Sequence, residues 1–231
     1  MALKLRLAPE RILMAVLFGS IGLCVASYVT QYLKIKHGHS YIYGFVPFFN
    51  VDIEHNFSSW WSFSLLLIVA ILLGVIAGAD WVRAGRYRYH WAALALVFSW
   101  LSFDEATEWH ERFIAPVAEA LDPPRLFTFA WVIPGLVFVG VLGALYFSFL
   151  RALPAATARW FYLGALIYLS GALGMEMIGG WYYSHFKVDM VYVTLTHIEE
   201  LLEMLGLSIF IYALLTHMRT ERLEIGVGPE S

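Results

Sequence analysis

Six apolar segments, each about as long as a lipid bilayer is thick, constrain this chain more than any other feature. They cover residues 12–33, 59–82, 91–113, 127–150, 158–182 and 190–217. A helix needs roughly 20 mostly apolar residues to cross the hydrocarbon layer. The chain is 60% hydrophobic and only 14% charged, whereas soluble domains carry about 25% charged residues. We therefore expect an all-α polytopic membrane protein, with six transmembrane helices forming a single domain over residues 1–231.

The distribution of Lys and Arg predicts the orientation. The N-terminus, the second and fourth connections and the C-terminal tail hold ten basic residues, and the opposite connections hold five. Basic residues accumulate on the cytoplasmic side of membrane proteins. Both termini are therefore expected to be cytoplasmic, in an integral protein of a bacterial cytoplasmic (inner) membrane. No basic patch is interleaved with stacking aromatics, so nucleic acid is not an expected partner.

Acidic residues interrupt three of these apolar segments. Eight of the eighteen acidic residues lie in or beside them: Asp104, Glu105, Glu108, Glu111, Glu176, Glu199, Glu200 and Glu203. An ionisable group in the hydrocarbon layer is costly, so such groups usually mark a functional site. Arg112 is the only permanent positive charge in these clusters. The carboxylates therefore need bound cations, bound protons or outside partners.

The expected topology gives the three clusters a common depth. The third and fifth segments run outward with their acids in their later halves, and the sixth runs inward with its acids in its earlier half. At about 1.5 Å per residue, Asp104 lies roughly 20 Å above the cytoplasmic end of its helix. All three clusters therefore fall in the outer leaflet, where they can meet.

Helical spacing predicts which side chains share a face. At about 100° per residue, a continuous third helix places Asp104, Glu108 and Glu111 on one face, with Glu105 beside it and His110 pointing nearly the opposite way. On the sixth helix, His197 and Glu200 share a face, with Glu203 on its flank.

Carboxylates and an imidazole projecting from several helices are typical of a metal site in a helical bundle. Hard oxygen ligands with one imidazole favour Fe, Mn or Zn. We expect a divalent metal ion held by Asp104, Glu108, Glu111, Glu176, His197 and Glu200. Glu105 or Glu203 is then the expected general acid or base, because burial can tune a carboxyl group for proton transfer.

A site at this depth suits a lipid-soluble substrate, such as a lipid, an isoprenoid or a quinone, that enters from the surrounding membrane lipid. We expect a metal-dependent membrane enzyme. A proton or cation transporter is an alternative, with Glu203, Glu200 and Glu199 as successive stations. Two further alternatives are a non-catalytic subunit bound to partner membrane subunits, and a metal-free cluster held by shared protons.

The segment over residues 34–57 faces the same side as the acidic clusters. It is rich in aromatic residues and also carries Asp52, Glu54 and His55. Such a composition is typical of a segment lying at the membrane interface. The alternative is a lid over the acidic site.

Overall fold

The computed structural model describes residues 3–4, 8–186, 188–221, 223 and 226–227. Of the basic residues used to predict the orientation, Arg6, Lys187 and Arg222 lie outside these ranges. The α-helices are α1 (Pro9–His37), α2 (Phe45–Phe49), α3 (Phe57–Val82), α4 (Arg88–Thr107), α5 (Ile114–Leu121), α6 (Val132–Ala152), α7 (Ala155–Leu169), α8 (Glu176–Phe186) and α9 (Met190–Thr220). A π-helix over Ser170–Met175 joins α7 to α8, and the two-residue strands β1 (Leu3–Lys4) and β2 (Gly226–Val227) pair antiparallel. The all-α fold class is confirmed.

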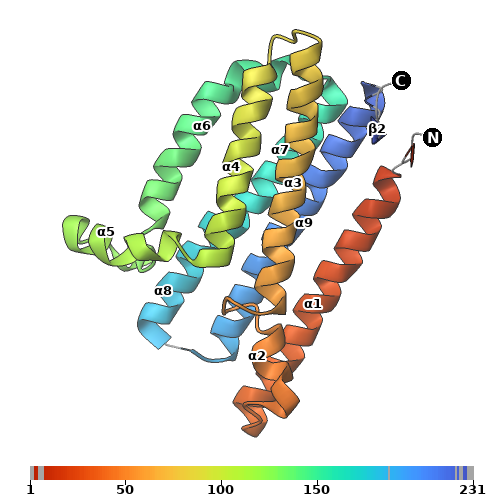
Figure 1. Cartoon of the computed structure of the whole chain (residues 1–231). Helices are drawn as coiled ribbons and strands as arrows, with labels where there is room; N and C mark the ends of the chain where they lie inside the picture. The colour runs from red at the N-terminus through yellow and green to blue at the C-terminus, as the bar shows by residue number, and fades with distance from the viewer. Residues whose placement is uncertain (1–2, 5–7, 187, 222, 224–225, 228–231) are drawn as a thin grey trace.

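Among the residues that the structure describes, five helical stretches are long and apolar enough to cross a membrane: α1, α3, α6, the continuous stretch Ala155–Phe186, and α9. They are compatible with an integral membrane protein. α4 corresponds to the third predicted segment but is not among the five. It packs along α3 (Figure 1), and its last turn contains Asp104 and Glu105.

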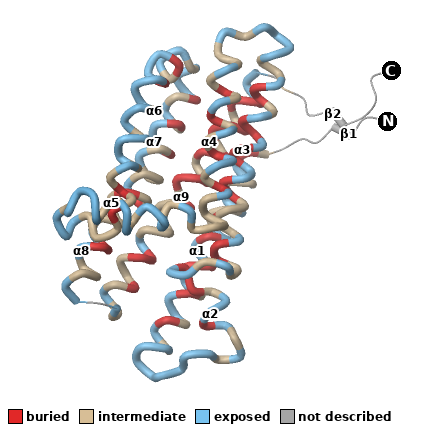
Figure 2. The backbone as a smooth tube through the Cα atoms, turned by 60° about the vertical axis from the view of Figure 1, so that its left-hand side comes forward, coloured by how far each residue is buried: buried red, intermediate tan, exposed pale blue. Residues whose placement is uncertain are grey.

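α9 is the central helix of the bundle. It contacts α1, α3, α7 and α8, and it is the most buried of the spans, whereas α6 is the least buried. The apolar core is formed chiefly by α3, α4 and the later part of α9, with Phe149 and Phe161 packed against them. Figure 2 shows the same contrast, with buried residues along α3 and α9 and exposed ones over α5 and α6.

The two ends of the bundle differ. The α3–α4 and α6–α7 connections lie at the end where α1 begins and α9 finishes (Figure 1). α2, α5 and the α8–α9 connection lie at the opposite end. The acids of α4, α8 and α9 are displaced toward that opposite end and line one cavity, so the three clusters lie at one level of the bundle.

The third predicted segment is not one continuous helix, and this corrects the expectation for residues 91–113. α4 ends at Thr107, and Glu108 adopts a left-handed backbone with φ 52° and ψ 37°. The backbone N–H of His110 donates to Asp104 Oδ1 at 2.8 Å instead of continuing the helix. Short acidic side chains can compete with helical hydrogen bonds in this way. His110 is thereby turned back toward Asp104, rather than away from it as predicted.

Glycines allow α7, the π-helix and α9 to approach closely. A Cβ added to Gly206 would lie 2.6 Å from the backbone nitrogen of Tyr168, and one added to Gly171 would lie 2.8 Å from the carbonyl oxygen of Glu199. Small residues at such crossings are typical of packed membrane helices. This approach fixes the height of the α9 acids relative to α7, and the π-helix ends directly before Glu176. Single π-helical turns within α-helices occur often at functional sites.

Candidate functional site

A cavity of about 630 Å³ lies between α4, α6, α7, α8 and α9. Ten carboxyl side chains line it: Asp52, Glu54, Asp104, Glu105, Glu108, Glu111, Glu176, Glu199, Glu200 and Glu203. Among the described residues that line it there is no Lys or Arg. We call the part formed by these carboxyl groups and His110 the acidic chamber. The structure thus brings together all seven of the carboxylates that the sequence nominated for metal binding or catalysis.

Asp104 and His110 form a hydrogen-bonded pair at the wall of the acidic chamber. His110 Nδ1 lies 2.8 Å from Asp104 Oδ2, while Asp104 Oδ1 accepts the backbone N–H of the same histidine. Because a carboxylate only accepts, Nδ1 carries the proton. The carboxylate therefore fixes the orientation of the ring and leaves Nε2 as the nitrogen available for chemistry. Asp–His pairs of this kind orient both general bases and metal-bound imidazoles.

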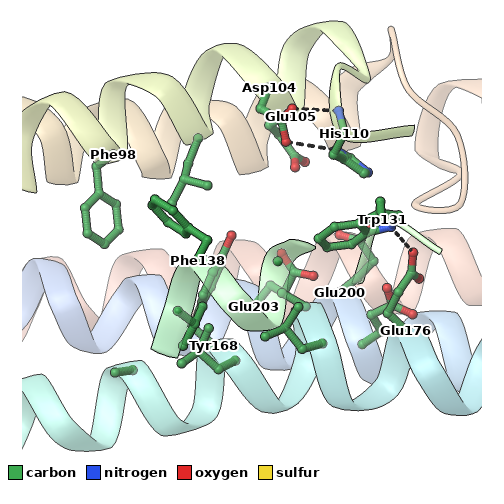
Figure 3. Close-up of a pocket in the computed structure, with 18 of the residues that line it drawn as sticks. Phe98, Asp104, Glu105, His110, Trp131, Phe138, Tyr168, Glu176, Glu200 and Glu203 are labelled. Carbon is green, nitrogen blue, oxygen red and sulfur yellow. Dashed lines mark hydrogen bonds and ion pairs between the residues drawn. The ribbon is translucent and has the colours of Figure 1, made fainter. Parts of the chain in front are cut away.

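Trp131 connects this pair to α8. Its indole ring packs on the His110 ring with centroids 4.7 Å apart, and its Nε1–H donates to Glu176 Oε1 at 2.8 Å. Figure 3 shows Asp104, His110, Trp131 and Glu176 as one series across the chamber. Trp131 is a site residue that the sequence did not nominate, since an interfacial tryptophan is the usual interpretation of its position.

Glu105 and Glu203 face the chamber from opposite sides. Glu105 projects from α4 and Glu203 from α9, toward the same space (Figure 3). The hydroxyl of Tyr168 interacts with the Glu203 carboxyl group, and Phe98 and Phe138 lie on the side away from His110 (Figure 3). The two residues expected to transfer protons therefore lie at the boundary between the polar and the apolar lining.

The segment before α3 contributes to the chamber through Asp52 and Glu54. Burial raises the pKa of Glu54 to about 9, reinforced by the negative charges of Glu105, Glu108, Glu111 and Asp104. Burial also raises the pKa of Asp52. The segment therefore covers part of the acidic site, which was the lid alternative of the sequence analysis.

The loop after α4 is shaped by the same charges. Burial raises the pKa of Glu111, as does the neighbouring charge of Glu108. Burial lowers the pKa of His110, but the hydrogen bond and charge of Asp104, with Glu176 and Glu105, outweigh it and raise the pKa. Glu108 also lies 3.6 Å from His55 Nδ1, at the exposed rim. Glu111 and His110 therefore both hold a proton more tightly than the isolated side chains do.

His197 does not line the cavity, which corrects its predicted place beside Glu200. Its Nδ1–H donates to the Val193 carbonyl oxygen at 2.6 Å, and Nε2 accepts from the Ser27 hydroxyl at 2.9 Å. Ser27 in turn accepts the backbone N–H of Val51 at 3.1 Å. The roughly 60° between positions three apart is enough, on a helix as central as α9, to turn His197 toward α1 and Glu200 toward the chamber. His197 is buried outside the cavity, and His110 is the histidine that lines it.

Within the part of the chain that the structure describes, no three His, Cys, Asp or Glu side chains are arranged to hold one metal ion together. The donors themselves are hard oxygens with one oriented imidazole, which is a suitable set for Fe, Mn or Zn.

Beyond Glu105 and Glu203 the cavity continues as an apolar arm. Its lining comes from four helices and includes Leu94, Phe98, Leu142, Tyr146, Phe161 and Phe210. The arm runs toward the end of the bundle that holds the termini, so that one cavity combines an acidic chamber with a hydrocarbon-like extension.

The family described as Domain of unknown function (DUF8692) matches residues 12–218. The chain belongs to this family. The match includes every helix that lines the cavity and all ten of its carboxyl groups. No curated protein and no solved structure shows a significant match to the chain.

Proposed function

We propose that this chain is an integral membrane enzyme whose acidic chamber binds a divalent metal ion, Fe, Mn or Zn, and acts on a lipid-like or quinone-like substrate. The observation that carries the proposal is the single cavity in which ten carboxyl groups and the Asp104–His110 pair adjoin an apolar arm. A charged chamber alone would suit ions, and an apolar arm alone would suit lipid. Their junction at Glu105 and Glu203 suits chemistry on an amphiphile.

The proposal assigns a role to each group in the chamber. His110, Glu176 and Glu200 are the metal ligands, with Glu108 and Glu111 at the rim. Loading requires these flexible side chains to turn toward His110, since they do not converge as they stand. Asp104 is the positioning residue that orients the imidazole.

The protein's own proton transfers fall to Glu105 and Glu203. Both lie next to the apolar arm, where a substrate's polar head would rest, and buried carboxyl groups can act as acids near neutral pH. A bound metal would supply a Lewis acid and a source of activated water, or redox chemistry if it is iron.

Six membrane passages, with both termini in the cytoplasm, complete the proposal. α4 would make the sixth passage beside α3, with its acidic last turn facing the chamber instead of lipid. The basic residues Arg83, Arg86, Arg88 and Arg151 lie at the end of the bundle that holds the termini, and the positive-inside rule assigns that end to the cytoplasm. A bacterial inner membrane is the proposed location.

Metal analysis of the purified protein tests the proposal. We expect stoichiometric Fe, Mn or Zn by mass spectrometry, lost in His110→Ala and reduced about 10–100-fold in affinity in Asp104→Asn. His185→Ala removes an exposed histidine outside the cavity and is the matched control. His197→Ala should keep its metal. Substoichiometric metal that does not change in His110→Ala would contradict the proposal.

The alternatives make different demands on the same cavity. A proton or cation pathway needs polar stations beyond Glu203, where the lining is instead apolar. Measurable flux in proteoliposomes that disappears in Glu203→Gln would favour transport. Co-purification with other membrane subunits in mild detergent would favour a non-catalytic subunit.

A further inference from the structure

The inward face of α6 lines a cavity instead of packing on a neighbouring helix. The cavity-lining residues of this helix after Gly135 are Phe138, Val139, Leu142, Gly143, Tyr146 and Leu150. Their spacing follows one helical face. In a filled bundle such an apolar stripe would pack against the next helix. Here the stripe borders the cavity along its length, although its later residues also contact the apolar core, so it is available for a ligand.

The length of this stripe is that of a hydrocarbon chain. From Gly135 to Tyr146, where the far end closes, there are eleven steps of about 1.5 Å, or roughly 16 Å. One leaflet of a bilayer has a hydrocarbon depth of about 15 Å. The apolar arm is therefore long enough for a chain from the surrounding lipid, whereas a compact apolar molecule would fill only part of it.

Aromatic residues close the far end of the arm. Tyr146 is 7% exposed and donates its hydroxyl to the carbonyl oxygen of His90 at 2.9 Å. Phe149 is fully buried and stacks on the His90 ring, and it also contacts the Trp91 ring edge-to-face. A stop built from interlocked rings is rigid, so it limits how far a chain can enter.

Among the described residues, the polar end of the cavity offers no Lys or Arg side chain that could bind an anionic head group. The described lining residues include no Lys or Arg, and the head would rest between Glu105, Glu203 and Tyr168. Hydroxyl and carbonyl groups can hydrogen-bond to such partners.

We propose that the apolar arm binds the single hydrocarbon chain of an amphiphile with an uncharged polar head, and that Tyr146 sets the longest chain accepted. This names the substrate class for the proposed function and rests on it for the position of the head. The binding of the chain itself requires no metal.

Photolabelling in nanodiscs tests the site. The probes are straight-chain and isoprenoid alcohols of graded length, each with a diazirine at the end of the chain, and the labelled peptides are mapped by mass spectrometry. We expect the longer probes to label the cavity-lining residues Leu142, Tyr146 or Leu150 of α6, or Phe161 of α7. Comparison of the straight-chain and isoprenoid probes then shows which of the two kinds of hydrocarbon chain the arm prefers. Labels confined to lipid-facing residues such as Val137 and Leu145 would overturn the proposal.

Two glycines of α6 provide a matched pair of variants. A Cβ on Gly143 or on Gly140 meets nothing within 4 Å, but only Gly143 lines the cavity. Gly143→Phe should reduce labelling by the longest probe at least tenfold and spare the shortest, while Gly140→Phe should change neither. Equal labelling in the two variants would overturn the proposal. Ala165→Leu, on the α7 wall of the arm, repeats the test if Gly143→Phe does not fold.

The outcome is separable from that of the metal analysis. If the metal analysis finds no ion while labelling follows chain length, the metal ion is refuted and the chain site stands. If the metal is stoichiometric and labelling does not change in Gly143→Phe, the chain site is refuted and the metal ion stands.

Discussion

The two parts of α9 on either side of Glu203 are packed in opposite ways. From Met204 to Met218 the inward side chains are closely packed by α3, α4 and α7, and Met204, Leu207 and Leu214 are at most 1% exposed. From Glu199 to Glu203 the same helix borders an open cavity with three carboxyl groups. The closely packed part of α9 and the part that borders the cavity are thus adjacent along one helix. Apolar side chains in place of the three carboxyl groups would make the second part more stable. Functional sites are where sequences accept such a cost.

The packed region should be the more sensitive to loss of volume. Met204→Ala removes a side chain that is fully buried, and we expect it to destabilise the protein by about 2 kcal/mol or more. Thermal unfolding in detergent measures the loss. Leu145→Ala, on a residue that is 67% exposed, is the control and should change little. Equal effects of the two substitutions would mean that this region is not closely packed.

The helix crossing beside it should be sensitive to added volume. Gly206→Ala places a methyl group 2.6 Å from the Cβ of Tyr168, and overpacking of this kind costs about 1–3 kcal/mol. Gly140→Ala adds the same methyl group where nothing lies within 4 Å, and should be neutral or slightly stabilising because alanine favours helix. The same unfolding assay compares them. If Gly206→Ala is as stable as Gly140→Ala, the close approach of α7 and α9 is refuted.

A substitution in the acidic region should stabilise the protein, whereas the two substitutions above should destabilise it. Glu203→Gln replaces one of several acidic groups that line the same cavity, so we expect the metal-free protein to gain about 0.5–2 kcal/mol while any activity is lost. Glu221→Gln, at the other end of α9 where the carboxylate pairs with Arg83 at 3.7 Å, should give no gain. Destabilisation by Glu203→Gln in the presence of chelator would show that the acids are individually needed for folding.

The change of stability with pH is the smallest of the expected effects. The pKa of Glu54 is raised from 4.5 to about 9, by burial and by Glu105, Glu108, Glu111 and Asp104. A raised folded-state pKa means that the native state binds more protons than the unfolded state, so stability falls as pH increases. The contribution of Glu54 is complete below pH 4.5 and is lost as pH rises through 9. Burial raises the pKa of Asp52, and the Asp104 bond and charge raise that of His110 despite its burial, so both act in the same sense.

Unfolding between pH 5 and 8 in chelator should therefore show stability declining toward pH 8. Excess Mn²⁺ should reverse the slope, because protons compete with the metal for the same oxygens. Glu54→Gln should flatten the decline in chelator, and Glu119→Gln, which lies outside the cavity on α5, should not. Identical slopes with and without metal would contradict metal binding in the chamber.

Most of the helical framework follows from hydropathy. The predicted segments 59–82 and 190–217 correspond to Phe57–Val82 and Met190–Thr220, and 158–182 lies within Ala155–Phe186. Apolar length is a property of the local sequence, so it can be read without knowledge of packing.

The error in the third segment arose from a single side chain. The hydrogen bond from the His110 backbone to Asp104 ends α4, and helical propensity does not record it. Propensity alone favoured a continuous helix, and the predicted direction of His110 was wrong for that reason. Glu108 and Glu111 nevertheless line the same cavity as Asp104. The same break placed His110 in the chamber when the sequence had directed it away.

The composition of the acidic chamber was predictable, but its histidine was not. Carboxylates in apolar segments are conspicuous wherever they point, because burial penalises them on any face. A histidine can be satisfied by a backbone carbonyl and one serine, as His197 is by Val193 and Ser27, and this serine lies far along the chain. Asp52 and Glu54 reach the chamber through a loop whose path periodicity cannot predict.

Anomalous diffraction, or metal-sensitive density from the protein loaded with Mn²⁺, tests the central claim most directly. The account predicts an ion in the acidic chamber beside His110 Nε2, with oxygen ligands from Glu176 and Glu200 and the apolar arm running away from it. An ion bound elsewhere, or no ion in the chamber of the fully loaded protein, would contradict it.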